Sequence, residues 1–147
     1  MEKKNIDWGN IGFSYMPTDM RYVANFKDGK WDEGGMTADS NVVINECAGI
    51  LQYCQECFEG LKAYRTPDGS IQLFRPDKNA QRMINTNHRM CLPSLPVEDF
   101  VQAVKAIVSF DQDWVPHAEG TSLYIRPFVI ATEPHLGVRT YRTHKFI

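Results

Sequence analysis

Tyr124 and Arg126 stand out in a run of the sequence that is otherwise rich in leucine, isoleucine, valine and phenylalanine. Residues i and i+2 of a strand project from the same face, so we expect the phenol and the guanidinium to lie side by side. A guanidinium in such a run needs a partner, because burying it unpaired is costly. Two kinds of partner fit: an internal carboxylate such as Glu59 or Glu133, or the carboxylate of a bound substrate.

Arg82 and Arg89 lie two turns apart on a predicted helix, on the side away from its apolar residues. By periodicity alone this spacing favours a cationic stripe exposed to solvent. The alternative is that one of the two arginines binds a phosphate, where a charge-assisted hydrogen bond contributes about 1.5–3 kcal/mol.

The other reactive side chains form no recognisable site. Cys54 and Cys57 have the spacing of metal and redox sites, but a four-ligand zinc site needs a second pair, which Cys47 and Cys91 do not make. Lys62 lies in a predicted hairpin strand without any mark of a reactive lysine, so we expect a surface side chain. The sequence has no glycine-rich phosphate loop and no nucleophile elbow. The residues alone therefore predict an arginine-lined anion site, no metal centre and no complete catalytic apparatus.

These side chains must be positioned by hairpins and strands that the local pattern predicts. Alternating apolar residues at 61–65 and 70–74 flank a Thr-Pro-Asp-Gly turn and predict a hairpin. Asp28-Gly29 predicts another hairpin near the N-terminus. Residues 41–48 are expected to form a short strand, whereas 49–55 fit a helix or a strand. The longest predicted strand covers residues 121–132, with Pro127 marking an edge position or a bulge, and a further strand begins at 141–147.

Two helices are expected between these strands. The first has Asp77 as its N-cap, shows apolar residues at helical spacing from Ala80 and ends near Cys91. The second begins around Pro96 and ends before Asp111, with an apolar stripe along one side. The sequence therefore predicts an α+β fold: a mostly antiparallel sheet flanked by two helices. We expect an N-terminal arm over residues 1–40 and a small domain over residues 41–147.

Composition and charge narrow the classes of function. The chain has 147 residues, a net charge of −2 and 43% hydrophobic residues, as in one soluble globular domain. No apolar run approaches the roughly 20 residues that cross a bilayer, and no signal-like segment begins the sequence, so we expect a cytoplasmic protein without membrane contact. Residues 1–60 hold five basic and ten acidic side chains, and residues 61–147 eleven and eight. The arginine-rich second part suits a small anion, but no basic cluster with aromatic residues predicts nucleic-acid binding.

Five segments follow one another along the chain: YCQECFEGLKAYR at 53–65, then DGSIQLFRPDKNAQRM, MCLPSL, DWVP and GTSLYIRPFVIATEPHLGV. In this order and without obvious gaps they resemble the branched-chain amino acid aminotransferases, which are class IV aminotransferases and fold-type IV pyridoxal phosphate enzymes. The preceding DWGNIGFSYMPTDMRYVANFKDGKWDEG is similar to the entry segment of the same family. The resemblance runs from about Ile6 to Ile147 and covers only the family's N-terminal, smaller domain.

The resemblance implies a role for each matching residue. Arg82, in NAQRM, matches the arginine that holds the phosphate of pyridoxal 5′-phosphate. Arg126 and Tyr124, in SLYIRP, match the pair that receives the substrate's carboxylate end, including the side-chain carboxylate of glutamate. Tyr53 and Phe58 match walls of the apolar pocket for leucine, isoleucine and valine side chains.

The resemblance also implies a reaction and an assembly. Val138, in HLGV, matches a loop that covers the pocket of the neighbouring subunit, which implies a homodimer when the protein is full length. The implied reaction moves an amino group between a branched-chain L-amino acid and 2-oxoglutarate, as in branched-chain amino acid biosynthesis. The lysine that binds the cofactor belongs to the larger domain, so we expect no catalytic residue in this chain and no activity from the chain alone. Cys54 departs from the pattern, because many members carry glycine there.

Two other functions remain open at the level of sequence. A D-amino acid aminotransferase or an aminodeoxychorismate lyase shares the architecture, although the SLYIRP and FEGLKAYR strings favour the branched-chain group. A non-catalytic module that binds a small phosphorylated or carboxylated ligand through Arg82 and Arg126 is the alternative from another class.

Overall fold

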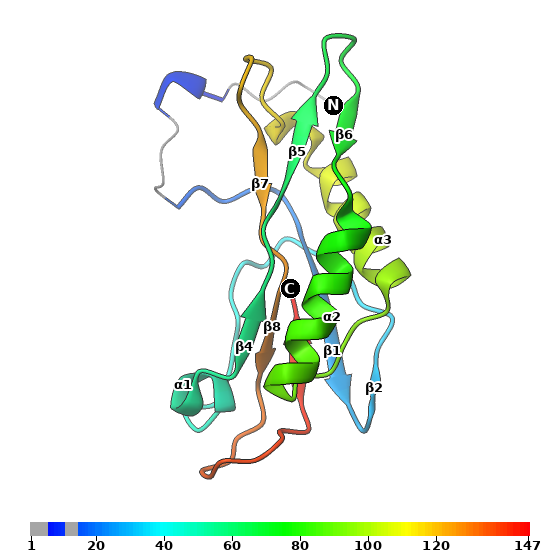
Figure 1. Ribbon diagram of the computed structural model, residues 1–147. Coiled ribbons are helices and arrows are strands. Elements are labelled where there is room, and N and C mark those ends of the chain that lie inside the picture. Colours follow the sequence, from blue (N-terminus) through cyan, green and yellow to red (C-terminus); the bar gives the residue numbers. More distant parts are fainter. Residues whose placement is uncertain (1–5, 11–14) are drawn as a thin grey trace.

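The computed structural model describes residues 6–10 and 15–147, which form two antiparallel sheets with two long helices packed against them (Figure 1). The larger sheet has six strands: its order is β2-β1-β9-β8-β4, and β3 pairs with β1. The smaller sheet has three strands in the order β6-β5-β7. The predicted α+β class is confirmed. The strands are β1 (Arg21–Lys27), β2 (Lys30–Trp31), β3 (Gly35–Thr37), β4 (Glu56–Phe58), β5 (Leu61–Arg65), β6 (Ile71–Leu73), β7 (Leu123–Ile125), β8 (Phe128–Ala131) and β9 (His144–Phe146).

Both predicted hairpins are confirmed. Asp28 and Gly29 join β1 to β2 with φ angles of 54° and 81°, and positive values at both positions are what a type I′ turn requires. In the second hairpin β5 pairs with β6, so that Arg65 lies opposite Ile71. Gly69, with a φ of 87°, makes that turn possible.

Both predicted long helices are present, and the start of the first needs a correction. Helix α2 spans Pro76–Met90 and helix α3 spans Val97–Phe110. Asp77 is not the N-cap of α2. Pro76 takes the first helical position, where its missing N–H and fixed φ are no disadvantage, and Asp77 follows it and pairs with Arg75 at 3.3 Å. The described residues also form two short 3-10 turns, Trp8–Asn10 and Gln112–Trp114.

The main apolar core lies between these helices and the six-stranded sheet. Phe100 of α3 and Phe146 of β9 are at most 2% exposed, and their ring centroids lie 5.9 Å apart. Ala80 and Met83 bring α2 into the same core. The apolar stripes predicted from helical spacing therefore face the sheet, while the opposite side of α2 is free for polar side chains.

Residues 41–47 do not form the predicted strand. The Asn45 side chain accepts a hydrogen bond from the backbone N–H of Cys47 at 2.8 Å, and its carbonyl accepts one from Ala48 at 2.9 Å. This turn competes with an extended backbone, and asparagine favours it. Ala48 makes an isolated bridge with Pro134. The next segment, which the sequence left open, is the short helix α1, Gly49–Tyr53.

The single strand predicted over residues 121–132 is wrong, because the chain there forms β7 and β8, which belong to different sheets. Pro127 has no N–H to continue a ladder, so pairing stops at Arg126-Pro127. The chain also changes sheet at Glu59-Gly60, between β4 of the larger sheet and β5 of the smaller one. The chain thus passes between the sheets twice, and the Glu59 N–H donates to the Pro127 carbonyl at 2.8 Å. We call these four residues the sheet crossover.

The strand expected over residues 141–147 is shorter, since β9 spans only His144–Phe146, and it lies between β1 and β8. Residues 21–37 supply β1, β2 and β3 to the same sheet, while the division into an arm (1–40) and a domain (41–147) stays a prediction. Among the described residues, no helix is long and apolar enough to span a membrane.

Candidate functional site

The sheet crossover gathers most of the side chains that the sequence singled out. Phe58 ends β4 immediately before the first passage, and Arg126 belongs to the second. Tyr124 lies at the centre of β7, and Arg82 reaches the first passage from α2. Tyr53 and Val138, the other two predicted site residues, lie elsewhere.

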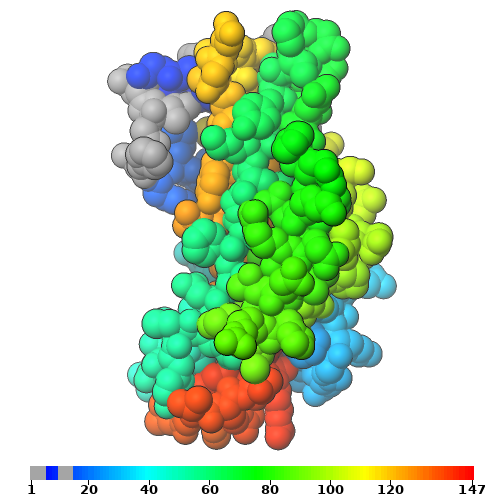
Figure 2. Space-filling view, viewed as in Figure 1, coloured from blue at the N-terminus to red at the C-terminus, as the bar shows by residue number. Residues whose placement is uncertain are grey.

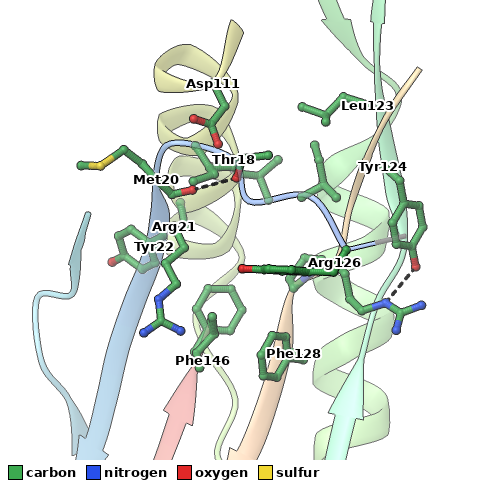
Figure 3. A pocket seen from close by; sticks show the side chains of 17 residues that line it. Thr18, Met20, Arg21, Tyr22, Asp111, Leu123, Tyr124, Arg126, Phe128 and Phe146 are labelled. Atoms are coloured by element: carbon green, nitrogen blue, oxygen red, sulfur yellow. Dashed lines mark hydrogen bonds between the residues drawn. The ribbon is translucent and has the colours of Figure 1, made fainter. Parts of the chain in front are cut away.

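Arg126 rests on two aromatic rings. Its Cζ lies 4.7 Å from the centroid of the Phe58 ring and 5.4 Å from that of Tyr124. Its Nε donates to the Tyr124 hydroxyl at 3.3 Å, a bond that Figure 3 shows as a dashed line. The rings are about half exposed and attract the cation through their π faces. No carboxylate of the described residues pairs with Arg126. The internal ion pair with Glu59 or Glu133, one of the two partners that the sequence left open, is therefore not formed.

Both of those carboxylates hold other arginines. Glu133 pairs with Arg139. Glu59 pairs with Arg82 through two bonds, from Nε to Oε1 at 2.8 Å and from Nη2 to Oε2 at 2.6 Å. The Arg82 side chain is 67% exposed and Glu59 only 5%. Arg82 is thus at the surface, as periodicity suggested, but it is held by a buried partner rather than free in solvent.

The protonation of Glu59 follows from this pairing. Burial on its own would raise the pKa of Glu59, but hydrogen bonds from Arg82 and Asn79 outweigh it and hold the pKa below its usual value. The same hydrogen bond, together with the negative charge, raises the pKa of Arg82. The pair is therefore fully ionised at neutral pH.

The sequence analysis missed Gly60 and did not place Lys62 at this site. A Cβ on Gly60 would lie 2.7 Å from the Tyr124 hydroxyl oxygen, so the phenol occupies the space that any other side chain would need. Lys62 lies directly opposite Tyr124 in the β5–β7 ladder, so both side chains are on one face. Lys62 is exposed, as expected, but it lies beside the Tyr124–Arg126 pair. The signal for both residues is the pairing of β5 with β7, which the local sequence does not reveal.

Tyr53 and Val138 lie at the other end of the six-stranded sheet. Tyr53 ends α1, and Val138 belongs to the loop between β8 and β9; Figure 2 shows these two segments next to each other at the lower end of the molecule. The two side chains are 44% and 88% exposed. The Tyr141 hydroxyl braces the loop by donating to the Gly137 carbonyl at 3.1 Å. Within one chain both side chains are thus exposed and lie apart from the crossover.

Behind the crossover lies a cavity of about 400 Å³, between β7, the start of β1 and α3 (Figure 3). Most of its lining is apolar, and Asp111 is buried at one end. Burial raises the pKa of Asp111, and a hydrogen bond from Thr18 opposes that rise. The guanidinium of Arg126 turns toward the Tyr124 hydroxyl rather than toward Asp111, so its charged end lies away from the buried carboxyl group.

The two closely spaced cysteines have different environments. Cys54 is exposed at the end of α1, with a φ of 53°, whereas Cys57 is buried in β4. Burial, and next the charge of Glu59, raises the pKa of Cys57. Across residues 6–10 and 15–147, no three histidine, cysteine or acidic side chains lie together as a metal site would require.

Sequence comparison finds proteins related to nearly the whole of this chain. It is 53% identical over 138 residues to a branched-chain-amino-acid aminotransferase of Haemophilus influenzae, covering 93% of this chain and 40% of that protein. A branched-chain-amino-acid aminotransferase of Helicobacter pylori is 41% identical over 145 residues, which cover 98% of this chain and 43% of that protein. No family model matches the sequence. The chain thus spans about two fifths of the length of these relatives.

Comparison with solved structures supports the same relationship at the level of the fold. The branched-chain amino acid aminotransferase of Escherichia coli matches with a TM-score of 0.65 at 20% identity, over 86% of this chain and 38% of that chain. A second such enzyme, from T.th. and complexed with N-(5′-phosphopyridoxyl)-L-glutamate, matches with a TM-score of 0.60 at 19% identity, over 88% and 41%. This chain is therefore a partial-length homologue of the branched-chain-amino-acid aminotransferases and has the fold of the corresponding part of these fold-type IV proteins.

Proposed function

We propose that this chain is the part of a branched-chain amino acid aminotransferase that holds the phosphate of pyridoxal 5′-phosphate at Arg82 and a substrate carboxylate at Arg126 and Tyr124. The reaction transfers an amino group between L-leucine, L-isoleucine or L-valine and 2-oxoglutarate. The observation that carries the proposal is the state of Arg126: it is exposed, oriented by two aromatic rings and paired with no carboxylate of the described residues.

The residues present fit a phosphate at Arg82. Glu59 occupies Nε and one side of Nη2, so Nη1 and the outer side of Nη2 are left as donors on an exposed guanidinium. Planar guanidinium groups bind phosphate well because they offer two parallel hydrogen bonds. A related solved structure contains a phosphopyridoxyl-glutamate and another a pyridoxamine 5′-phosphate. When bound, the cofactor supplies the electron sink for the transfer of nitrogen.

The crossover suits a reaction with two unlike substrates. The exposed Phe58 ring offers an apolar wall to a branched side chain, while Arg126, stacked on the same ring, offers a cation to the side-chain carboxylate of glutamate. The contact with the ring face uses none of the guanidinium N–H groups, so those other than Nε–H stay free to donate, and the Tyr124 hydroxyl steadies Nε. One surface can therefore receive either substrate without a large rearrangement.

Tyr53 and Val138 complete the proposal in a second subunit. Because they lie away from the crossover in one chain, we infer that they contribute apolar walls to the site of a partner copy in a homodimer. The family resemblance implies that the lysine of the reaction belongs to a larger domain, so we propose that these 147 residues alone are inactive. A cytoplasmic location stays a prediction.

The test is a calorimetric titration of the chain with 2-oxoglutarate. Arg126→Met should weaken binding by about tenfold, because a charge-assisted hydrogen bond is lost. Arg89→Met removes the same charge from an exposed position of α2 and should leave the affinity within about twofold. Equal effects of the two substitutions would contradict the proposal.

A second measurement tests whether the chain alone is inactive. The pure chain, incubated with pyridoxal 5′-phosphate, leucine and 2-oxoglutarate, should form no glutamate. Tight binding of both pyridoxal 5′-phosphate and 2-oxoglutarate by a chain that stays inactive even alongside the larger domain would favour the anion-binding module instead. The names of the related proteins favour the branched-chain enzymes over other class IV enzymes.

A further inference from the structure

Glu59 binds Arg82 in a way that fixes the direction of the guanidinium. Two parallel hydrogen bonds define the plane of the group, whereas a single bond would let it rotate. Arg82 projects from α2 with most of its side chain in solvent. Without Glu59, its rotatable bonds would sample many positions, and ordering them on binding an anion would cost free energy.

The same carboxylate is tied to the second half of the site. Asn79, one turn before Arg82 on α2, donates its side-chain N–H groups to Glu59 Oε2 at 3.0 Å and to the Gly60 carbonyl at 3.2 Å. Gly60 in turn lies against the Tyr124 hydroxyl, which accepts from Arg126. The residues around Glu59 therefore form a continuous path of contacts from Arg82 to Arg126.

We propose that Glu59 is a positioning residue, which fixes Arg82 as an anion-binding group and sets its place relative to Tyr124 and Arg126. This inference rests on the proposed function, in which a phosphate binds at Arg82. It goes beyond that function because it gives Glu59 a role of its own. Glu59 is too buried to touch the ligand, but it orients the Arg82 guanidinium, which binds the ligand.

Charge and positioning predict opposite results at Glu59. A carboxylate within hydrogen-bonding distance of Arg82 repels a phosphate, so its removal would tighten phosphate binding if charge were its only influence. If Glu59 holds the guanidinium in place, its removal weakens binding, because the free side chain must be ordered by the ligand. The sign of the change therefore decides between the two roles.

The experiment compares Glu59→Gln with Asp77→Asn by NMR titration of the chain. Asp77 is a half-exposed acid on the same helix, paired with Arg75, so its substitution removes one negative charge without touching the crossover. The probe is pyridoxine 5′-phosphate, and pyridoxine, which lacks the phosphate, is its reference. We expect Glu59→Gln to weaken the phosphate-dependent affinity about tenfold and Asp77→Asn to leave it unchanged or slightly tighter.

Hydrogen exchange of the Arg82 Nε–H gives a readout that needs no ligand. In the unaltered chain Glu59 should protect this proton, and Glu59→Gln should speed its exchange about tenfold, while thermal unfolding shows that the variant still folds. Tighter phosphate binding by Glu59→Gln, or unchanged exchange at Arg82, would overturn the inference. If Arg82→Met leaves the affinity for the probe unchanged, the proposed phosphate site fails instead, and the exchange measurement still decides whether Glu59 fixes Arg82.

Discussion

Gly60 is required by its neighbour and not by its own backbone. Its φ is not among the positive values in the chain, so an alanine would suit the local conformation but not the space taken by the Tyr124 hydroxyl. Gly60→Ala should displace that hydroxyl from Arg126 and weaken 2-oxoglutarate binding about fivefold, the equivalent of one hydrogen bond. Calorimetry measures this change. Gly35→Ala, where a Cβ would meet no atom within 4 Å, should have no effect, and equal affinities for the two variants would contradict the steric argument.

His144 gives stability a dependence on pH. The side chain is 1% exposed and neither ring nitrogen has a hydrogen-bond partner among the described residues. Burial lowers the pKa of His144 to about 4, and the charge of Glu133 opposes that only in part. In the unfolded chain the imidazole titrates near 6.5, so between these values the unfolded state binds more protons. Stability should therefore fall as the pH drops from about 6.5 to about 4, by up to about 3 kcal/mol.

Urea unfolding across this pH range measures the effect. His144→Leu should remove the part of the loss that occurs above pH 4, whereas His88→Leu, at an exposed position of α2, should keep it. The pH effect of His144 can be told apart from that of Glu59. Because the pKa of Glu59 is lowered in the folded chain, Glu59 contributes its full stabilisation above its ordinary pKa near 4.5 and loses that contribution only at lower pH. A profile unchanged by His144→Leu would show that another group is responsible.

At the scale of elements, α2 ends at a residue that disfavours the conformation it adopts. Cys91 has a φ of 55° and closes the helix with its N–H on the carbonyls of Asn87 and His88. Glycine adopts this left-handed conformation without the steric cost of a Cβ. Cys91→Gly should raise the free energy of unfolding by about 0.5–1 kcal/mol. Thermal unfolding checks this, and Cys91→Ala, which loses the thiol but keeps the Cβ, should not show the gain.

Elements that depend on neighbouring residues were predictable from the sequence. The turns at Asp28-Gly29 and around Gly69 predicted the two hairpins, and the spacing of apolar residues predicted both long helices. Pro127 was expected at an edge position or a bulge, but the change of sheet there was not predictable. It depends on which strands β7 and β8 pair with: β7 pairs with β5, and β8 with β4 and β9. The same reason hid Gly60 and the place of Lys62 beside Tyr124. Local chemistry left the roles of Arg82 and Arg126 undecided, and the roles expected for them came from the family resemblance.

For the molecule as a whole, we expect the packing of α3 against the larger sheet to be a main source of stability, because Phe100 and Phe146 are buried there. Phe100→Ala removes a ring that is 1% exposed and packs against Phe146, and should destabilise the fold by about 3–5 kcal/mol. Phe110→Ala is a matched control on the same helix, where the side chain is 56% exposed, and should cost less than about 1 kcal/mol. Urea denaturation measures both changes. A similar loss from the two would mean that α3 is held by something other than this core.

The place of β9 in the larger sheet has a consequence for synthesis on the ribosome. This strand, formed by residues 144–146, is a central one, and the Lys145 ammonium donates to the Asn25 side chain across 120 positions of sequence at 2.6 Å. The hairpins and helices can form as they emerge from the ribosome. Strands β1 and β8 cannot become part of one sheet until β9, which lies between them, has been made. Their unpaired edges stay open to chaperones or to a neighbouring nascent chain until elongation delivers Phe146.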